Sequence, residues 1–94
     1  MAGRIVTKNQ SMAQVRLDNG ERVLISFTTS EVAIFKLIFR GFIPIYKIWR
    51  LGIDAYLERI SFSANPVEDM ADAIIACHST DEIPQAVQKY LGRI

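Results

Sequence analysis

The only cysteine and the only histidine of the chain are neighbours, Cys77 and His78. A catalytic nucleophile needs a base within hydrogen-bonding distance. Adjacent helical side chains point about 100° apart, so these two cannot form a catalytic pair with each other. We interpret Cys77 as a small core residue. We interpret His78 as a residue of the last turn of a helix, where the helix dipole favours a cation.

Other kinds of catalytic or metal site are also not supported. One cysteine and one histidine cannot fill a tetrahedral metal site, and Asp69 and Asp72 lie where acids are common in the first turns of a helix. The glycines are scattered along the chain rather than gathered in a phosphate-binding loop. We therefore expect a protein that is not an enzyme and that holds neither a cofactor nor a metal.

Aromatic and basic residues are interleaved along residues 35–62, which hold seven of the nine aromatic residues. Basic side chains beside exposed rings are how proteins grip single-stranded nucleic acid. One hypothesis is thus a nucleic-acid-binding surface made of Arg16, Arg22, Lys47, Arg50, Tyr46 and Trp49. The alternative is that the rings form the core and the cations form its solvent-exposed rim.

The net charge of +1 conceals an uneven distribution. Residues 1–50 hold eight Lys or Arg against three acids, and residues 51–94 hold three Lys or Arg against seven acids. The basic half could present a face to an anionic partner, or the two halves could be layers of one domain that attract each other. The second interpretation predicts that Glu68, Asp69 or Asp72 lies near cations of the other half.

The N-terminal half has the pattern of strands. Residues 4–8, 12–17 and 22–28 are short, rich in β-branched residues and separated by polar turns. Residues 31–39 fit either a helix that begins at a Thr28-x-x-Glu31 capping box or a buried strand, and we favour the strand. Residues 43–49 are predicted to begin extended, because the residue before Pro44 avoids the α region.

The turn at Asp18-Asn19-Gly20 fixes how the second and third predicted strands pair. A three-residue loop with Gly20 in the left-handed conformation brings Val15 opposite Val23 and keeps the core on one face. The same register brings Arg16 opposite Arg22, which is destabilising unless a negative group neutralises the pair. Asp18 and Glu21 could do so locally, or an external phosphate or carboxylate could do so.

The C-terminal half has helical periodicity. Asn65-Pro66-Val67-Glu68 is a typical helix start, with an apolar stripe continuing to about Cys77. A second helix is predicted from Ser79-Thr80-Asp81-Glu82 to Gly92, and a short one over 53–60. We expect one α+β domain over residues 1–94: an antiparallel meander or small open barrel of up to five strands in 3–51, covered by two or three helices in 53–92.

We expect a cytoplasmic protein, because a lone cysteine forms no internal disulfide and the N-terminus has no signal-peptide pattern. The apolar stretch 32–51 is interrupted by four cations and Pro44, which argues against a transmembrane helix. The favoured function is a non-enzymatic protein-interaction module that self-associates; the alternative is nucleic-acid binding. In a strand over 31–39, apolar residues occupy both faces. The chain would then be a homodimer with Val32, Ile34 and Ile38 at the interface.

Overall fold

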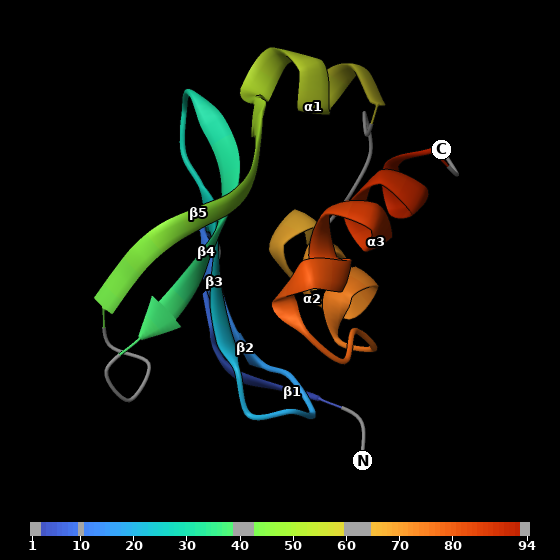
Figure 1. Cartoon of the computed structure of the whole chain (residues 1–94). Helices are drawn as coiled ribbons and strands as arrows, with labels where there is room; N and C mark the ends of the chain where they lie inside the picture. The colour runs from blue at the N-terminus through green and yellow to red at the C-terminus, as the bar shows by residue number, and fades with distance from the viewer. Residues whose placement is uncertain (1–2, 10, 39–42, 60–64, 93–94) are drawn as a thin grey trace.

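The structure is a computed structural model that describes residues 3–9, 11–38, 43–59 and 65–92. Within these residues the chain forms a five-stranded antiparallel sheet and three α-helices that lie on one side of it (Figure 1). The strands are β1 (Arg4–Lys8), β2 (Met12–Arg16), β3 (Arg22–Phe27), β4 (Glu31–Ile38) and β5 (Ile43–Gly52). The helices are α1 (Ile53–Arg59), α2 (Pro66–Ile74) and α3 (Ile83–Leu91). The predicted α+β fold, a meander covered by C-terminal helices, is confirmed.

The strands follow one another across the sheet in the order β1-β2-β3-β4-β5, so each pairs with its neighbour in sequence. The predicted register of the β2–β3 hairpin is confirmed, with Val15 opposite Val23. Gly20 has a φ of 94°, and the N–H of Leu17 donates to the carbonyl oxygen of Glu21 at 2.8 Å. The turn is thus the predicted three-residue loop with a left-handed glycine.

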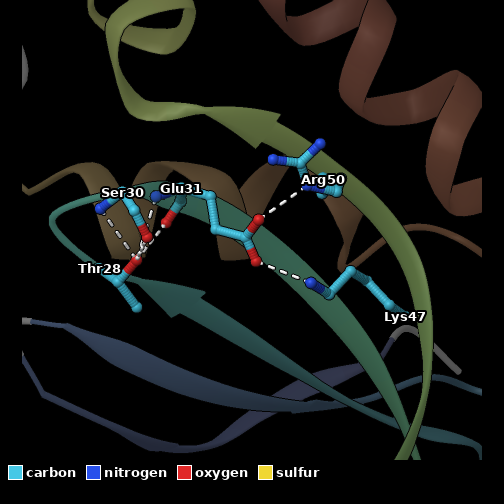
Figure 2. Close-up of polar contacts among 5 residues, drawn as sticks. All are labelled: Thr28, Ser30, Glu31, Lys47 and Arg50. Carbon is cyan, nitrogen blue, oxygen red and sulfur yellow. Dashed lines mark hydrogen bonds and ion pairs between the residues drawn. The ribbon is translucent and has the colours of Figure 1, made fainter.

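The Thr28-x-x-Glu31 pattern closes a turn into β4 rather than beginning a helix. The Oγ1 of Thr28 accepts hydrogen bonds from the N–H groups of Ser30 and Glu31 at 3.2 and 3.0 Å (Figure 2). The N–H of Thr28 donates to the carbonyl oxygen of Glu31 at 2.9 Å. The strand prediction is therefore confirmed from Glu31 to Ile38; Phe39 lies outside the described residues.

The core fills the space between the helices and the face of the sheet that they cover; we call the opposite face the outer face. Alternate residues of β2, β3 and β4 point toward the helices, as the period of a strand requires. Fully buried residues from both layers are Val15, Val23, Ile25, Val32, Ile34, Val67, Met70, Ile74, Ile83 and Val87. The ring of Tyr56 on α1 meets that of Phe27 edge-on, with 5.3 Å between centroids.

This packing corrects the predicted subunit interface. Val32 and Ile34 are both 0 % exposed within the single chain, where they belong to the same core cluster as Met70 and Ile74 of α2. The helices supply the cover that we had expected from a second copy. Ile38 is half-buried, so it alone of the three predicted interface residues retains accessible surface.

The helix starts differ in detail from the predictions. α2 begins at Pro66, but the side chain of Asn65 makes no capping hydrogen bond, and its carbonyl oxygen accepts the N–H of Asp69 at 3.0 Å. The second predicted start, at 79–82, is a short 3-10 helix, η1 (Thr80–Glu82), that leads into α3. No helix among the described residues combines the length and apolar character needed to cross a bilayer.

A Gly20→Ala substitution tests the turn that sets the β2–β3 register. No atom lies within 4 Å of the position that a Cβ would take at Gly20, so only the left-handed backbone is strained. The expected loss is about 1 kcal/mol of unfolding free energy. Gly52→Ala is the matched control, because its Cβ also meets nothing within 4 Å but its φ is not positive. Urea denaturation should separate the two variants; equal stabilities would contradict the strained turn.

Candidate anion-binding surface

Three arginines from three adjacent strands lie side by side on the outer face. The strand registers place Arg4 opposite Arg16 and Arg16 opposite Arg22. Neighbouring strands are about 5 Å apart, so the three Cα atoms form a line roughly 10 Å long. Arg4 and Arg16 are exposed and Arg22 is half-buried. We call Arg4, Arg16 and Arg22 the arginine row.

The other cations on the described strands each have an acidic partner. Lys8 lies 2.9 Å from Glu68 of α2, and Lys36 lies 2.9 Å from Glu21. Glu31 accepts from the Nζ of Lys47 at 2.8 Å and from the Nε of Arg50 at 2.7 Å (Figure 2). Among the residues that the structure describes, no acid forms an ion pair with the arginine row. Its positive charge is therefore not neutralised from within this part of the chain.

The two acids next to the row are engaged elsewhere. The sequence offers Asp18 and Glu21 as local neutralisers of Arg16 and Arg22. Oδ2 of Asp18 instead lies 2.6 Å from Nδ1 of His78, and this hydrogen bond raises the pKa of His78. Within the outer face, Nη1 of Arg22 donates a long hydrogen bond, 3.4 Å, to Oε1 of Gln14.

Glu21 joins the hairpin turn to β4 and to η1. Its carboxylate accepts hydrogen bonds from the N–H of Thr80 at 3.1 Å and from the hydroxyl of Thr80 at 3.0 Å, besides the ion pair with Lys36. Partial burial acts to raise the pKa of Glu21, but the hydrogen bonds from Asn19, Lys36 and Thr80 outweigh it and lower the pKa to about 2. Glu21 therefore stays ionised and bound to these groups at neutral pH.

The four cations predicted to bind nucleic acid lie on the outer face of the sheet, whereas Tyr46 and Trp49 do not. Arg16 and Arg22 are adjacent in the row, whereas Lys47 and Arg50 are held by Glu31, whose pKa their hydrogen bonds lower. Arg4 completes the row but is not among the predicted residues. The register shift between Ile5 and Thr7 breaks the regular alternation of side chains from which the β1–β2 pairing could have been predicted.

Tyr46 and Trp49 lie on the other face of the sheet from the arginine row. In β5, Trp49 pairs with Ile34, but Lys47 pairs with Phe35, so the chain has an irregularity at Ile48. One extra residue moves all following side chains to the other face. Tyr46 therefore points to the side of the helices, where it borders a groove with Thr80 and Pro84. Trp49 packs against the core.

The geometry gives little support for a reactive cysteine or a metal site among the described residues. Cys77 is buried, as predicted, and burial raises the pKa of its thiol. Within the described part of the chain, no three His, Cys, Asp or Glu side chains gather in a way that could hold a metal ion. No protein-family model, no curated protein and no solved structure matches this chain. The arginine row is thus the feature from which a function can be argued.

Acid titration of stability tests the role of Glu21. The pKa of Glu21 is lowered from 4.5 to about 2, so its stabilising contacts are fully present above pH 4.5. They are lost as the pH falls through the folded value. We expect Glu21→Gln to lose about 1 to 2 kcal/mol at neutral pH and to flatten the acid part of the stability profile.

Urea denaturation at several pH values measures this effect. Asp54→Asn, at an exposed carboxyl group of α1, is the control for removal of one negative charge. A Glu21→Gln variant with the acid profile of the parent protein would show that this carboxylate does not link the hairpin to η1.

Proposed function

We propose that the protein is a non-enzymatic interaction module that docks an anionic partner on the outer face of its sheet, and that it acts in the cytoplasm. The observation that carries the proposal is the arginine row. Four other cations on the described strands are paired with acids, while the three that lie adjacent are not. A partner that brings negative charge to this face would give these three arginines the acidic partners that the other four cations already have.

The row is well placed for binding. Like charges opposite each other in a ladder lower stability, and an arrangement that costs stability without a local gain is typical of a functional surface. A sheet also holds the Cα atoms of neighbouring residues at fixed spacing. Guanidinium groups bind carboxylates and phosphates through two parallel hydrogen bonds, so they suit this role better than lysines would.

Thermal unfolding with and without a polyanion tests the proposal. We expect heparin at low ionic strength to raise the melting temperature, because it binds the folded state. Added salt alone should also raise it by screening the repulsion within the row. Arg16→Gln should reduce both effects. Arg59→Gln, which removes an exposed cation of α1, is the matched control and should reduce neither. The absence of any heparin effect would overturn the proposal.

Self-association is a second candidate, at a place that shares Ile38 with the predicted interface but not Val32 or Ile34. β5 has one paired neighbour among the described strands, so its other edge can accept a strand. Beside β5, Lys36, Ile38, Tyr46, Ile48, Thr80, Asp81 and Pro84 line a groove of about 540 Å³, and Tyr46 is 61 % exposed. An exposed tyrosine next to apolar side chains is common at protein interfaces.

Light scattering over a range of protein concentrations tests this second candidate. We expect a dimer mass for the parent protein and a shift toward the monomer for Tyr46→Ser, because an aromatic anchor at the centre of an interface contributes about 2 kcal/mol or more. Leu57→Ser is the control, since Leu57 is also an exposed apolar residue, 53 % exposed, but lies on α1. A monomer mass at the highest concentration would exclude self-association.

A further inference from the structure

We infer that the anionic partner is a single-stranded nucleic acid that crosses the strands of the outer face, with phosphates on the arginine row and bases on the row of side chains beside it. This inference rests on the proposed function, because it names the partner of the same surface. It goes beyond that proposal by assigning a role to Leu24 and Phe35, which carry no charge.

The arginine row fits a chain of phosphates. Its three arginines stem from adjacent strands whose paired Cα atoms lie about 5 Å apart, so they present a line of charge rather than a single point. Such a line suits a ligand with a repeated negative charge. Arginine makes the bidentate contacts that phosphate oxygens accept, and it stays charged at any physiological pH.

A second row of side chains runs parallel to the first on the outer face. The strand pairings place Gln14 opposite Leu24, Leu24 opposite Phe35, and Phe35 opposite Lys47. We call these four residues the second row. Gln14 precedes Arg16 by two positions and Leu24 follows Arg22 by two positions, so the rows are direct neighbours.

The chemistry of the second row is that of a base-binding surface. Leu24 and Phe35 are half-buried, so they expose part of an apolar surface against which a base can pack. Gln14, at the end of the row, accepts a hydrogen bond from Arg22. The Nζ of Lys47 lies 5.4 Å from the centroid of the Phe35 ring. Apolar rings beside cations are the combination that grips single strands.

The two rows together favour a single strand over other polyanions. The bases of a duplex are stacked inside it and could not reach Leu24 or Phe35, which lie on a sheet surface rather than on an element that enters a groove. A purely acidic peptide such as poly-glutamate would use the arginine row but has no ring to pack against Leu24 and Phe35. A single strand engages both rows at once.

The binding experiment uses three labelled probes: an oligothymidylate of about ten nucleotides, the abasic form of the same backbone, and a poly-glutamate of similar charge. We expect the oligothymidylate to bind at least about five-fold tighter than the abasic backbone, since packing of one base already contributes that much. Its affinity should fall with salt with a log-log slope of about −2, the value for three phosphate contacts on a single strand.

Variants assign the two contributions to the two rows. Arg16→Gln should make the salt slope shallower by about 0.7, and the control Arg59→Gln should leave it unchanged. Phe35→Leu keeps an apolar side chain in place of the half-buried ring. It should lower affinity for the oligothymidylate several-fold but not for the abasic backbone. Thermal unfolding of each variant checks that it is folded.

The outcomes separate the inference from the proposed function. Equal binding of the oligothymidylate and its abasic form, or a salt slope that Arg16→Gln does not change, overturns the inference. Binding of poly-glutamate without binding of either oligonucleotide also overturns it, but leaves the anion-binding module standing. If none of the three probes binds and heparin does not raise the melting temperature, the inference and the proposed function both fail.

Discussion

The three-residue turn between β2 and β3 determines which face of the sheet each of their residues occupies. Gly20 adopts a φ of 94°, which other residues reach only with strain. A turn one residue shorter would pair core positions with solvent positions, because side chains alternate along a strand. With the observed turn, Val15 and Val23 face the helices. Arg16 and Arg22 must then lie opposite each other on the outer face.

The same turn links the two layers of the fold. Asp18 is its first residue and Glu21 follows it directly. Both side chains reach residues just before α3: Asp18 contacts His78, and Glu21 contacts Thr80. These contacts hold the hairpin against the helical layer. They also remove from the outer face the two acids closest in sequence to the arginines. These two side-chain contacts therefore both attach the helices to the sheet and leave the arginine row without acidic partners among the described residues.

Local patterns in the sequence predicted the strands, the β2–β3 register and the helices, because each depends on a few neighbouring residues. The candidate site was predicted only in part. Arg16 and Arg22 followed from the register, but the irregularity at Ile48 that turns Tyr46 toward the helices leaves no mark on the residue types of β5. The cover over Val32 and Ile34 likewise depends on how residues of α2, distant in sequence, pack.

Magnitudes explain how the fold tolerates the arginine row. Two unit charges about 5 Å apart in water repel by roughly 0.8 kcal/mol, and salt reduces this further. Exposed guanidinium groups on flexible side chains can also separate. The free-energy cost of this repulsion is therefore small compared with the stabilisation that the buried core provides. A ligand with several negative charges gains more, because each charge-assisted hydrogen bond is worth about 1.5 to 3 kcal/mol and one bound chain makes several of them. The three arginines therefore repel one another only weakly, but together they attract strongly a partner whose negative charges are spaced along a chain.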